Sequence, residues 1–258
     1  MHVGNDQDKN NKMKEPEHIL LLKWLILTGL IIFTVIVAWH EGVILMLYSV
    51  DKSHISMAIS LVYILVTIHC AKRIYAISLE TNLSRKIEKI IRNEDKIKIH
   101  INDERVLINS KIKLPQCLMT EYIKDLFYRN GKVSDNDESG SSSDLNDVYN
   151  SRLKGPQEIG WFVSDVMLKL GLLGTIIGFI FMLGSVANIA DFDVSNMQKI
   201  LRHMSNGMGT ALYTTLTGLV ASVLAAMQYH MIDRHVDGLI EMTRHMTHVH
   251  VIPKINNN

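Results

Sequence analysis

The sequence lacks most of what an enzyme site or a disulfide-stabilised fold requires. Among 258 residues it has only two cysteines, Cys70 and Cys117, which are too few for a disulfide framework and have no metal-ligand spacing. It contains no Walker-type phosphate loop, no GxSxG, no HExxH, no CxxC pair and no internal repeat. The low cysteine count favours reduced, intracellular thiols. The missing catalytic motifs make a membrane enzyme the weakest interpretation. We therefore expect a protein that is not an enzyme.

The charges are balanced, and the histidines are scattered. The formal net charge is +1, so the total indicates no particular partner, and we expect no nucleic acid to bind this subunit. His245, His248 and His250 form the one histidine cluster. Because this cluster lies in a tail that we expect to be frayed, we predict neither a metal site nor a bound cofactor.

Charged residues are rare in four apolar segments, each of which could cross a bilayer as a helix. The predicted spans are residues 19–39, 55–71, 166–187 and 207–230. Trp24 and Trp39 flank the first span in the way that interfacial anchors do. A cleaved signal peptide is the alternative for this first segment. It is disfavoured because the apolar run is long and no small-residue cleavage site follows it.

The basic residues predict the orientation of these spans, because Lys and Arg accumulate on the cytoplasmic side of a membrane. They cluster before the first span, after the second, before the third and after the fourth, whereas the two short connections hold few. We therefore expect both termini and the long middle segment in the cytoplasm. The basic residues in these clusters are Lys9, Lys12, Lys14, Lys72, Arg73, Arg85, Lys86, Lys89, Arg92, Arg152, Lys154 and Arg234.

The middle segment, between the second and third spans, has its own pattern. Apolar residues recur at helical spacing over residues 72–93, which predicts a helix that continues the second span. Residues 97–101 alternate like a strand, but the surrounding charges favour helix or loop. A second helix is predicted over residues 114–128. The polar, Ser-rich stretch 131–150 predicts a mobile loop, after which Pro156 is expected near a helix start.

These patterns together predict an all-α integral membrane protein with four transmembrane helices and a helical cytoplasmic segment between spans two and three. The expected divisions are a disordered cytoplasmic N-terminus (1–17), transmembrane helices one and two (18–71), the cytoplasmic segment (72–160), transmembrane helices three and four (161–231) and a cytoplasmic tail (232–258).

Small and hydroxylated residues line one side of each of the last two spans. A lipid-facing helix needs no such stripe, whereas small residues let helices approach closely and hydroxyls can bond across them or bind ions. The stripe of the third span is Gly171, Thr175, Gly178, Met182 and Ser185. The stripe of the fourth is Thr210, Thr214, Thr217 and Ala221, with Thr215, Gly218 and Ser222 beside it. The expected helix-packing glycines are Gly171, Gly174, Gly178, Gly207 and Gly218.

The two stripes carry a family resemblance. The runs GLLGTIIGF (171–179) and ALYTTLTGLVAS (211–222) resemble the MotA/TolQ/ExbB proton-channel family, over roughly residues 162–229. The four-span layout looks like the MotA and ZorA arrangement, whereas TolQ and ExbB have three spans. The resemblance implies five copies around a dimer of a MotB/TolR/ExbD-like protein whose single transmembrane helix carries an ion-binding aspartate. It also implies that transmembrane helices one and two are peripheral and that helices three and four line a pore.

The resemblance also assigns residues to the ion path. Thr175 matches the hydroxyl residue of the family's first pore helix and Thr215 that of the second. Thr210 stands where ExbB-like members have a glutamate. The predicted hydrocarbon parts of the spans hold no Asp or Glu, so the chain is expected to offer a hydroxyl wall to the partner's aspartate. The expected ion-path residues are Thr175, Thr215, Thr210 and Thr214. Helix packing is the alternative role for each.

The resulting expectation is a stator-type subunit of a rotary motor in the bacterial inner membrane. It would conduct protons, with sodium as the alternative ion, as a homopentamer in the lipid bilayer around the partner dimer. An ExbB/TolQ-like energiser of an outer-membrane system and a non-conducting membrane scaffold are the alternatives that the residues leave open.

Overall fold

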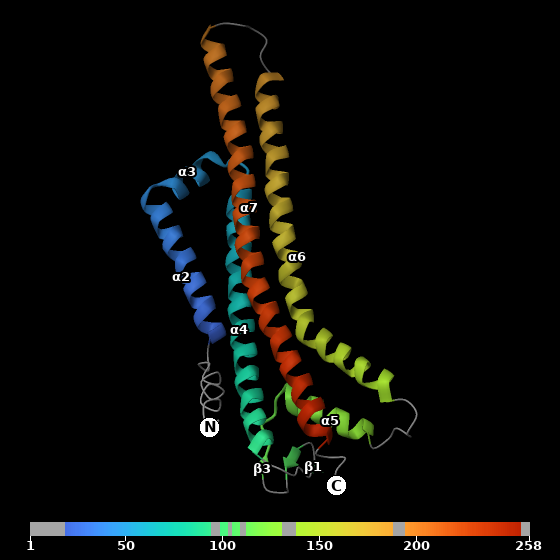
Figure 1. Ribbon diagram of the computed structural model, residues 1–258. Helices are drawn as coiled ribbons and strands as arrows, with labels where there is room; N and C mark the ends of the chain where they lie inside the picture. Colours follow the sequence, from blue (N-terminus) through green and yellow to red (C-terminus); the bar gives the residue numbers. More distant parts are fainter. Residues whose placement is uncertain are drawn as a thin grey trace, which may run out of the picture. The chain divides into compact units, whose positions relative to one another are not determined.

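The computed structural model describes residues 19–93, 99–102, 105–108, 112–130, 138–187 and 194–253. The expected disordered N-terminus, the first part of the expected loop and the last residues of the chain lie outside these ranges. The helices are α2 (Ile19–His40), α3 (Val43–Val50), α4 (Ile55–Asn93), α5 (Leu118–Asn130), α6 (Glu138–Ala187) and α7 (Val194–Met246), the last followed by a π-helical turn, Thr247–Val251 (Figure 1). The strands are β1 (Ile99–Asn102), β2 (Arg105–Ile108) and β3 (Ile112–Lys113).

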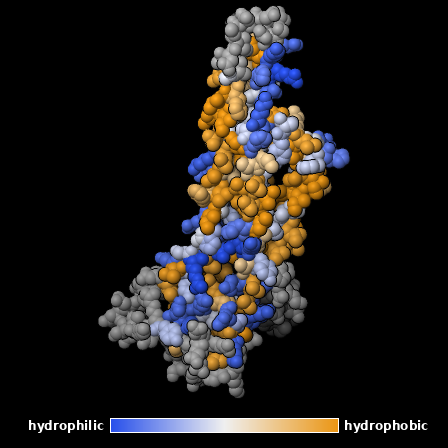
Figure 2. All heavy atoms as spheres, turned by 180° about the vertical axis from the view of Figure 1, so that it is seen from behind, coloured by the Kyte–Doolittle hydropathy of each residue, from blue (hydrophilic) through white to orange (hydrophobic). Residues whose placement is uncertain are grey.

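Four of these helices, α2, α4, α6 and α7, are long and apolar enough to cross a membrane. Within the most apolar window of α2, only 6% of residues are buried. Figure 2 shows apolar side chains covering much of the visible surface along the helices. Large apolar side chains that face outward over this length are what a lipid environment requires, since in water they would form an aggregation-prone surface. The prediction of an α-helical membrane protein is confirmed.

The chain divides into two compact units. The first, which we call the membrane unit, comprises Leu27–Arg73 and Gly155–Asp233. The second, which we call the peripheral unit, comprises Met1–Ile26, Ile74–Lys154 and Arg234–Asn258. The helix predicted to continue the second span is present, because α4 runs unbroken to Asn93. Each unit is described by itself below.

The peripheral unit contains a small antiparallel sheet in the order β1-β2-β3. Ile99 pairs with Ile108 and Asn102 with Arg105, so the expectation of helix or loop is wrong for residues 99–101. A strand forms despite the surrounding charges because β2 provides hydrogen-bond partners for the backbone of β1. A buried apolar cluster lies beneath the sheet and includes Cys117. Its residues are Ile87, Ile91, Val106, Leu114, Cys117, Met119, Ile123, Met246 and Val251.

The helix α6 begins earlier than the composition suggests. It starts at Glu138, so the expected loop is wrong for residues 138–150, and Pro156 lies inside the helix rather than at its start. Contacts with α5 explain the difference. The Tyr149 hydroxyl donates to Asp125 over 2.7 Å, and the Arg152 guanidinium contacts Glu121. Tertiary contacts of this kind outweigh a Ser-rich composition, which is a weak predictor of structure.

Two other segments also differ from expectation. The tail expected to be frayed is helical to Met246, and Thr243, Met246 and Thr247 are buried. The connection between the first two spans contains α3, a short helix that the sequence analysis did not predict. The first segment is held by its buried residues, and α3 by contacts such as the hydrogen bond from Thr210 of α7 to the carbonyl oxygen of Val50. The polarity of a single segment does not reveal such contacts.

Candidate ion-path surface of α6 and α7

In the membrane unit, α6 and α7 pack against each other along most of their shared length, in a contact that we call the α6/α7 seam. Buried residues recur at alternating spacings of three and four along both helices, the pattern of a coiled coil. Gly160 lies against Tyr229 and Gly178 against Ala211, so the helices run antiparallel. On α6 the buried residues are Gln157, Gly160, Ser164, Met167, Gly171, Gly174 and Gly178. On α7 they include Gly207, Ala211, Thr214, Gly218, Ala221 and Ala225.

Glycines allow this close approach. A Cβ atom on Gly218 would lie 2.7 Å from the Cα of Gly171, and one on Gly178 would lie 2.6 Å from the backbone nitrogen of Ala211. A Cβ on Gly207 would meet Met182 at 2.8 Å. Separations this short do not occur between a real Cβ and a backbone atom, so any larger residue would push the helices apart. All five glycines expected to pack pore helices lie along this seam.

Two of the four threonines expected on the ion path are buried within the protomer. Thr214 has no exposed surface and lies against Gly174, where a Cβ would come within 2.3 Å of the Thr214 Oγ1 atom. Its hydroxyl bonds to the carbonyl oxygens of Thr210 and Ala211, at 2.9 and 3.0 Å. Thr210 is also fully buried, and its hydroxyl donates to the carbonyl oxygen of Val50 over 2.8 Å. The structure therefore uses these two side chains for packing inside the protomer.

The other two threonines, Thr175 and Thr215, lie together on one flank of the seam and are half-buried. The Thr215 hydroxyl lies 3.2 Å from the carbonyl oxygens of both Gly171 and Ala211. Thr175 follows Gly171 by one helical turn, and its hydroxyl donates to the carbonyl oxygen of Leu172. Each hydroxyl has one proton to donate, so each oxygen keeps lone pairs that can accept from a proton carrier or coordinate a cation.

A polar turn at the start of α4 was not anticipated from the sequence. Asp51 is buried, and one of its carboxylate oxygens accepts from the backbone nitrogen and the hydroxyl of Ser53, at 2.9 and 2.6 Å. The other oxygen accepts from the backbone nitrogen of Ser56 at 2.8 Å. Burial acts to raise the pKa of Asp51, but the hydrogen bonds from Ser53 and Ser56 outweigh it and hold the pKa below its ordinary value. The sequence did contain a signal for this turn, because Asp and Ser residues immediately before a helix are typical of helix capping.

The other end of the membrane unit is held by aromatic contacts. Tyr229 is buried, and its hydroxyl lies 2.9 Å from Nδ1 of His69 on α4. Its ring lies against Gly160, where a Cβ would come within 2.0 Å of the Cζ atom. The indole nitrogen of Trp161 donates to the carboxylate of Asp233 over 2.8 Å. His69 thus serves as a structural partner of α7 at this level.

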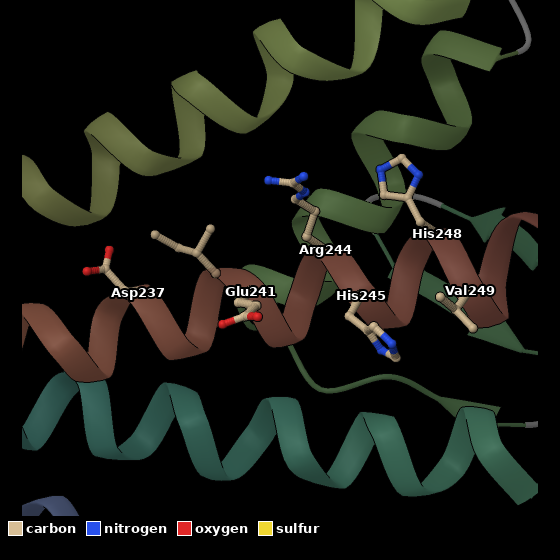
Figure 3. Close-up of a pocket in the computed structure, with 7 residues that line it drawn as sticks. Asp237, Glu241, Arg244, His245, His248 and Val249 are labelled. Carbon is tan, nitrogen blue, oxygen red and sulfur yellow. The ribbon is translucent and has the colours of Figure 1, made fainter.

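In the peripheral unit, a groove with a volume of about 610 Å³ is lined by residues of α7 and of the π-helical turn that follows it, between Asp237 and Val249. Arg244 and His248 point toward one side of the helix, whereas Glu241 and His245 point toward the other (Figure 3). These side chains do not converge on a common point. Within the described ranges, no group of three or more His, Cys, Asp or Glu side chains is placed to hold a metal ion.

The comparisons with known proteins agree with this geometry. Residues 149–245 match the model of the MotA/TolQ/ExbB proton channel family, a range that contains the whole α6/α7 seam described above. No curated protein and no solved structure matches the chain. Residues 149–245 are thus similar to a MotA/TolQ/ExbB proton channel family domain, which supports an ion-conducting membrane protein. Proteins of this family generally work with a MotB/ExbD/TolR-like membrane partner.

Proposed function

We propose that this MotA/TolQ/ExbB-family chain is a stator-type subunit of an ion-driven motor in the bacterial inner membrane. Five copies surround a dimer of a single-span partner, and protons cross the membrane between the two proteins, with sodium as the alternative ion. The partner supplies the ion-binding aspartate, and this chain supplies the hydroxyl wall against which that aspartate moves. The chain itself catalyses no chemical reaction and needs no cofactor.

The position of Thr175 and Thr215 on one flank of the seam is the observation that carries this proposal. Lipid would not hydrate a carboxylate that gains and loses an ion in the membrane, so a polar wall must lie beside it. The oxygens of Thr175 and Thr215 come from adjacent helices, and the Thr215 hydroxyl bonds to the carbonyl oxygen of Gly171 on the neighbouring helix. Thr210 and Thr214 contribute indirectly, since they hold the seam and the α3–α4 turn in place.

Ion flux through the assembled complex is the direct test. The full chain would be co-produced with its single-span partner, and proton uptake would be followed in membrane vesicles with a pH-sensitive dye. A partner variant with its membrane aspartate changed to asparagine is the control, because it removes the ion carrier and leaves the assembly. Flux that is equal with both partners would contradict the proposal.

Native mass spectrometry of the purified complex tests the assembly. Five copies with two partner copies are expected. A stable monomer, or lipid density against Thr175 and Thr215 in an electron-microscopy map, would contradict the pentameric arrangement.

The proposed orientation places both termini and the middle segment in the cytoplasm, because the basic residues cluster there. A cysteine at Ser142, in a chain with Cys70 and Cys117 replaced, should react with an impermeant thiol reagent only after the inner membrane is opened. Reaction in cells with an intact inner membrane would overturn this orientation.

The identity of the partner separates this proposal from the energiser alternative. The four candidate spans favour the stator-type arrangement, since TolQ-like and ExbB-like proteins have three. A partner with a peptidoglycan-binding domain after its membrane helix would support a motor, whereas association with a TonB-like protein would support an energiser. A chain that assembles without any such partner would be a scaffold.

A further inference from the structure

The packing of α6 against α7 places two charged residues at membrane depth. Gly160 contacts Tyr229, and Gly207 contacts Met182, so the apolar stretch 207–229 of α7 is level with residues 160–182 of α6. Asp165 and Lys169 lie about 7 Å and about 13 Å beyond Gly160 along the α6 axis, at the usual rise of about 1.5 Å per residue. Asp165 is thus inside the apolar layer, although the predicted third span begins only at residue 166.

The two side chains pair with each other and with no other described residue. The Lys169 ammonium contacts the Asp165 carboxylate at 2.5 Å, and the exposed fractions of these side chains are 70% and 52%. They are the only Asp, Glu, Lys or Arg residues in the segments 27–40, 55–71, 160–182 and 207–229. An exposed pair at this depth requires surroundings that solvate charge, because hydrocarbon does not.

Lipid is a poor neighbour for this pair. A lysine can extend its chain to reach the headgroups, but here the ammonium is held by Asp165, whose own side chain is short. The described surfaces at the same level are apolar and include Leu219, Val220 and Val223 of α7. The pair therefore differs in character from the lipid-facing surfaces beside it.

A second copy of the chain also cannot complement the pair. Copies that assemble in one membrane lie at the same depth, so the neighbour would present its own residues from this level. On α7 these exposed residues are the apolar side chains named above, and on α4 they are residues such as Leu61 and Ile64. Neither surface offers a charged partner to the ion pair, and the hydroxyl of α7 at this level, Ser222, is half-buried.

The polar face of α6 continues toward the start of the span. Glu158, Asp165 and Lys169 follow at i, i+7 and i+11, which places them on one helical face, and all three are exposed. Phe162 lies on the same face between Glu158 and Asp165 and is also exposed, so the charged residues alternate there with one apolar side chain. Beyond Lys169 the same face becomes apolar at Leu172 and Ile176. The polar face thus begins outside the apolar layer and ends within it, below the level of Thr175.

We propose that Glu158, Asp165 and Lys169 line a water-filled inlet that enters the membrane along α6 and ends at Lys169, about 9 Å short of Thr175 along the helix axis. Water and the transported cation occupy this inlet, and the Asp165 carboxylate is its cation-attracting group. Lys169 pairs with Asp165 and marks the inner end of the inlet. The existence of the inlet follows from the depth and exposure of the pair, whereas its use in conduction rests on the proposed function.

Thiol accessibility in membrane vesicles that contain the full chain tests the inlet. A thiol reacts as its thiolate, so a cysteine in water reacts with 2-sulfonatoethyl methanethiosulfonate and one in lipid does not. Lys169→Cys should react about tenfold or more faster than Val220→Cys, its control at the same level on α7. The native Cys70 and Cys117 are buried, so the parent chain gives the background.

Other outcomes of this labelling are equally decisive. Leu172→Cys keeps the ion pair intact and lies beside Lys169, so it should also react faster than Val220→Cys. Slow reaction of both Lys169→Cys and Leu172→Cys would overturn the inlet. In that case, fast reaction with lipid-soluble N-phenylmaleimide would assign the face to lipid, and slow reaction with both reagents would assign it to protein.

A second measurement separates the inlet from its role in conduction. Lys169→Cys should lower ion flux, and 2-aminoethyl methanethiosulfonate, which restores a positive charge, should recover the flux, whereas the neutral methyl reagent should not. Fast labelling with unchanged flux would keep the inlet and overturn its role in conduction. A parent chain that conducts no ions would overturn the proposed function and leave the labelling result in place.

Discussion

The Thr215 hydroxyl on α7 lies 3.2 Å from the carbonyl oxygen of Gly171 on α6, and this hydrogen bond crosses the seam beside Thr175. The contact is possible because Gly171 and Gly218 let the two backbones meet almost directly. The same glycine contact therefore explains both the close packing of the two helices and the hydrogen bond of Thr215 across them. The glycines bring α6 and α7 together, and the two threonines at the edge of the contact are half-buried.

We expect the pair Thr175→Val and Thr215→Val to preserve assembly and reduce ion flux. Valine matches threonine in shape but offers no oxygen to an ion in the dry part of the membrane. A lost hydrogen bond to a charged group is worth about 1.5–3 kcal/mol, which slows passage about tenfold or more if it acts on the barrier. Flux in vesicles with the partner present is the measurement.

The matched control for this pair is Thr28→Val on α2. The Thr28 hydroxyl has no hydrogen-bond partner among the described residues, so its loss should change neither assembly nor flux. Wild-type flux in the assembled double variant would show that Thr175 and Thr215 only pack helices, and would favour the scaffold alternative.

Gly218→Ala should destabilise the membrane unit. The new methyl carbon would lie 2.7 Å from the Cα of Gly171 and 2.9 Å from the carbonyl oxygen of Met167, both backbone atoms that cannot turn aside. Overpacking of this kind costs about 1–3 kcal/mol. Thermal unfolding in detergent should show a lower midpoint than Gly184→Ala, where a Cβ meets nothing within 4 Å. Equal midpoints would mean that the helices do not approach this closely.

Asp51→Asn should lower the free energy of unfolding by about 1 kcal/mol, as the loss of a capping carboxylate does, because it weakens the turn between α3 and α4. The folded-state pKa of Asp51 lies below the ordinary value of 3.8, so its contribution is present above pH 3.8 and is lost as the pH falls through the folded-state pKa. The parent should therefore lose stability below pH 3.8. The variant should be less stable than the parent at neutral pH, and its stability should change less with pH in the acid range.

The measurement for Asp51 is the thermal midpoint as a function of pH, with Glu41→Gln as the control because Glu41 is exposed. The same acid sensitivity in the parent and in Asp51→Asn would assign the effect to another group. A normal midpoint at neutral pH would show that Ser53 and Ser56 hold the turn without the carboxylate.

Gly160→Ala should destabilise the protein more than Tyr229→Phe, although both changes affect the contacts of Tyr229. The phenylalanine variant loses only the hydrogen bond to His69, worth about 0.5–1.5 kcal/mol. The alanine methyl would lie 2.0 Å from the Tyr229 ring and must displace it, at about 1–3 kcal/mol. Unfolding midpoints in detergent compare the two, with Gly155→Ala as the control at an open position. A Gly160→Ala chain as stable as this control would contradict the contact.

Hydrophobic length and helical spacing were sufficient to predict the long helices. An apolar run of about 20 residues has few alternatives to a membrane helix, because the backbone must satisfy its own hydrogen bonds in lipid. The continuation of α4 to Asn93 was also predictable, because Ile87 and Ile91 recur on one face. The strand Ile99–Asn102 was not, because its stability depends on pairing with Arg105–Ile108, and single-segment patterns do not contain that information.

The candidate site shows the same division. Composition indicated that glycines and threonines would share faces of two helices, but Thr210, Thr214, Thr175 and Thr215 could not be separated by spacing alone. Burial separates them, since Thr210 and Thr214 have no exposed surface and Thr175 and Thr215 are half-buried. The depth of Asp165 could not be predicted either, because the sequence of one helix does not determine its axial register against the next.

The sequence by itself determined that this chain is a helical membrane protein with two close-packing helices, because hydrophobic length and small-residue spacing act locally along each helix. Only the tertiary structure decided which hydroxyls turn inward and which remain on the flank, and that Asp165 and Lys169 lie beside the apolar part of α7. Those properties depend on the rotation and axial register of α6 against α7, which are set by contacts such as Gly171 with Gly218 and Gly160 with Tyr229.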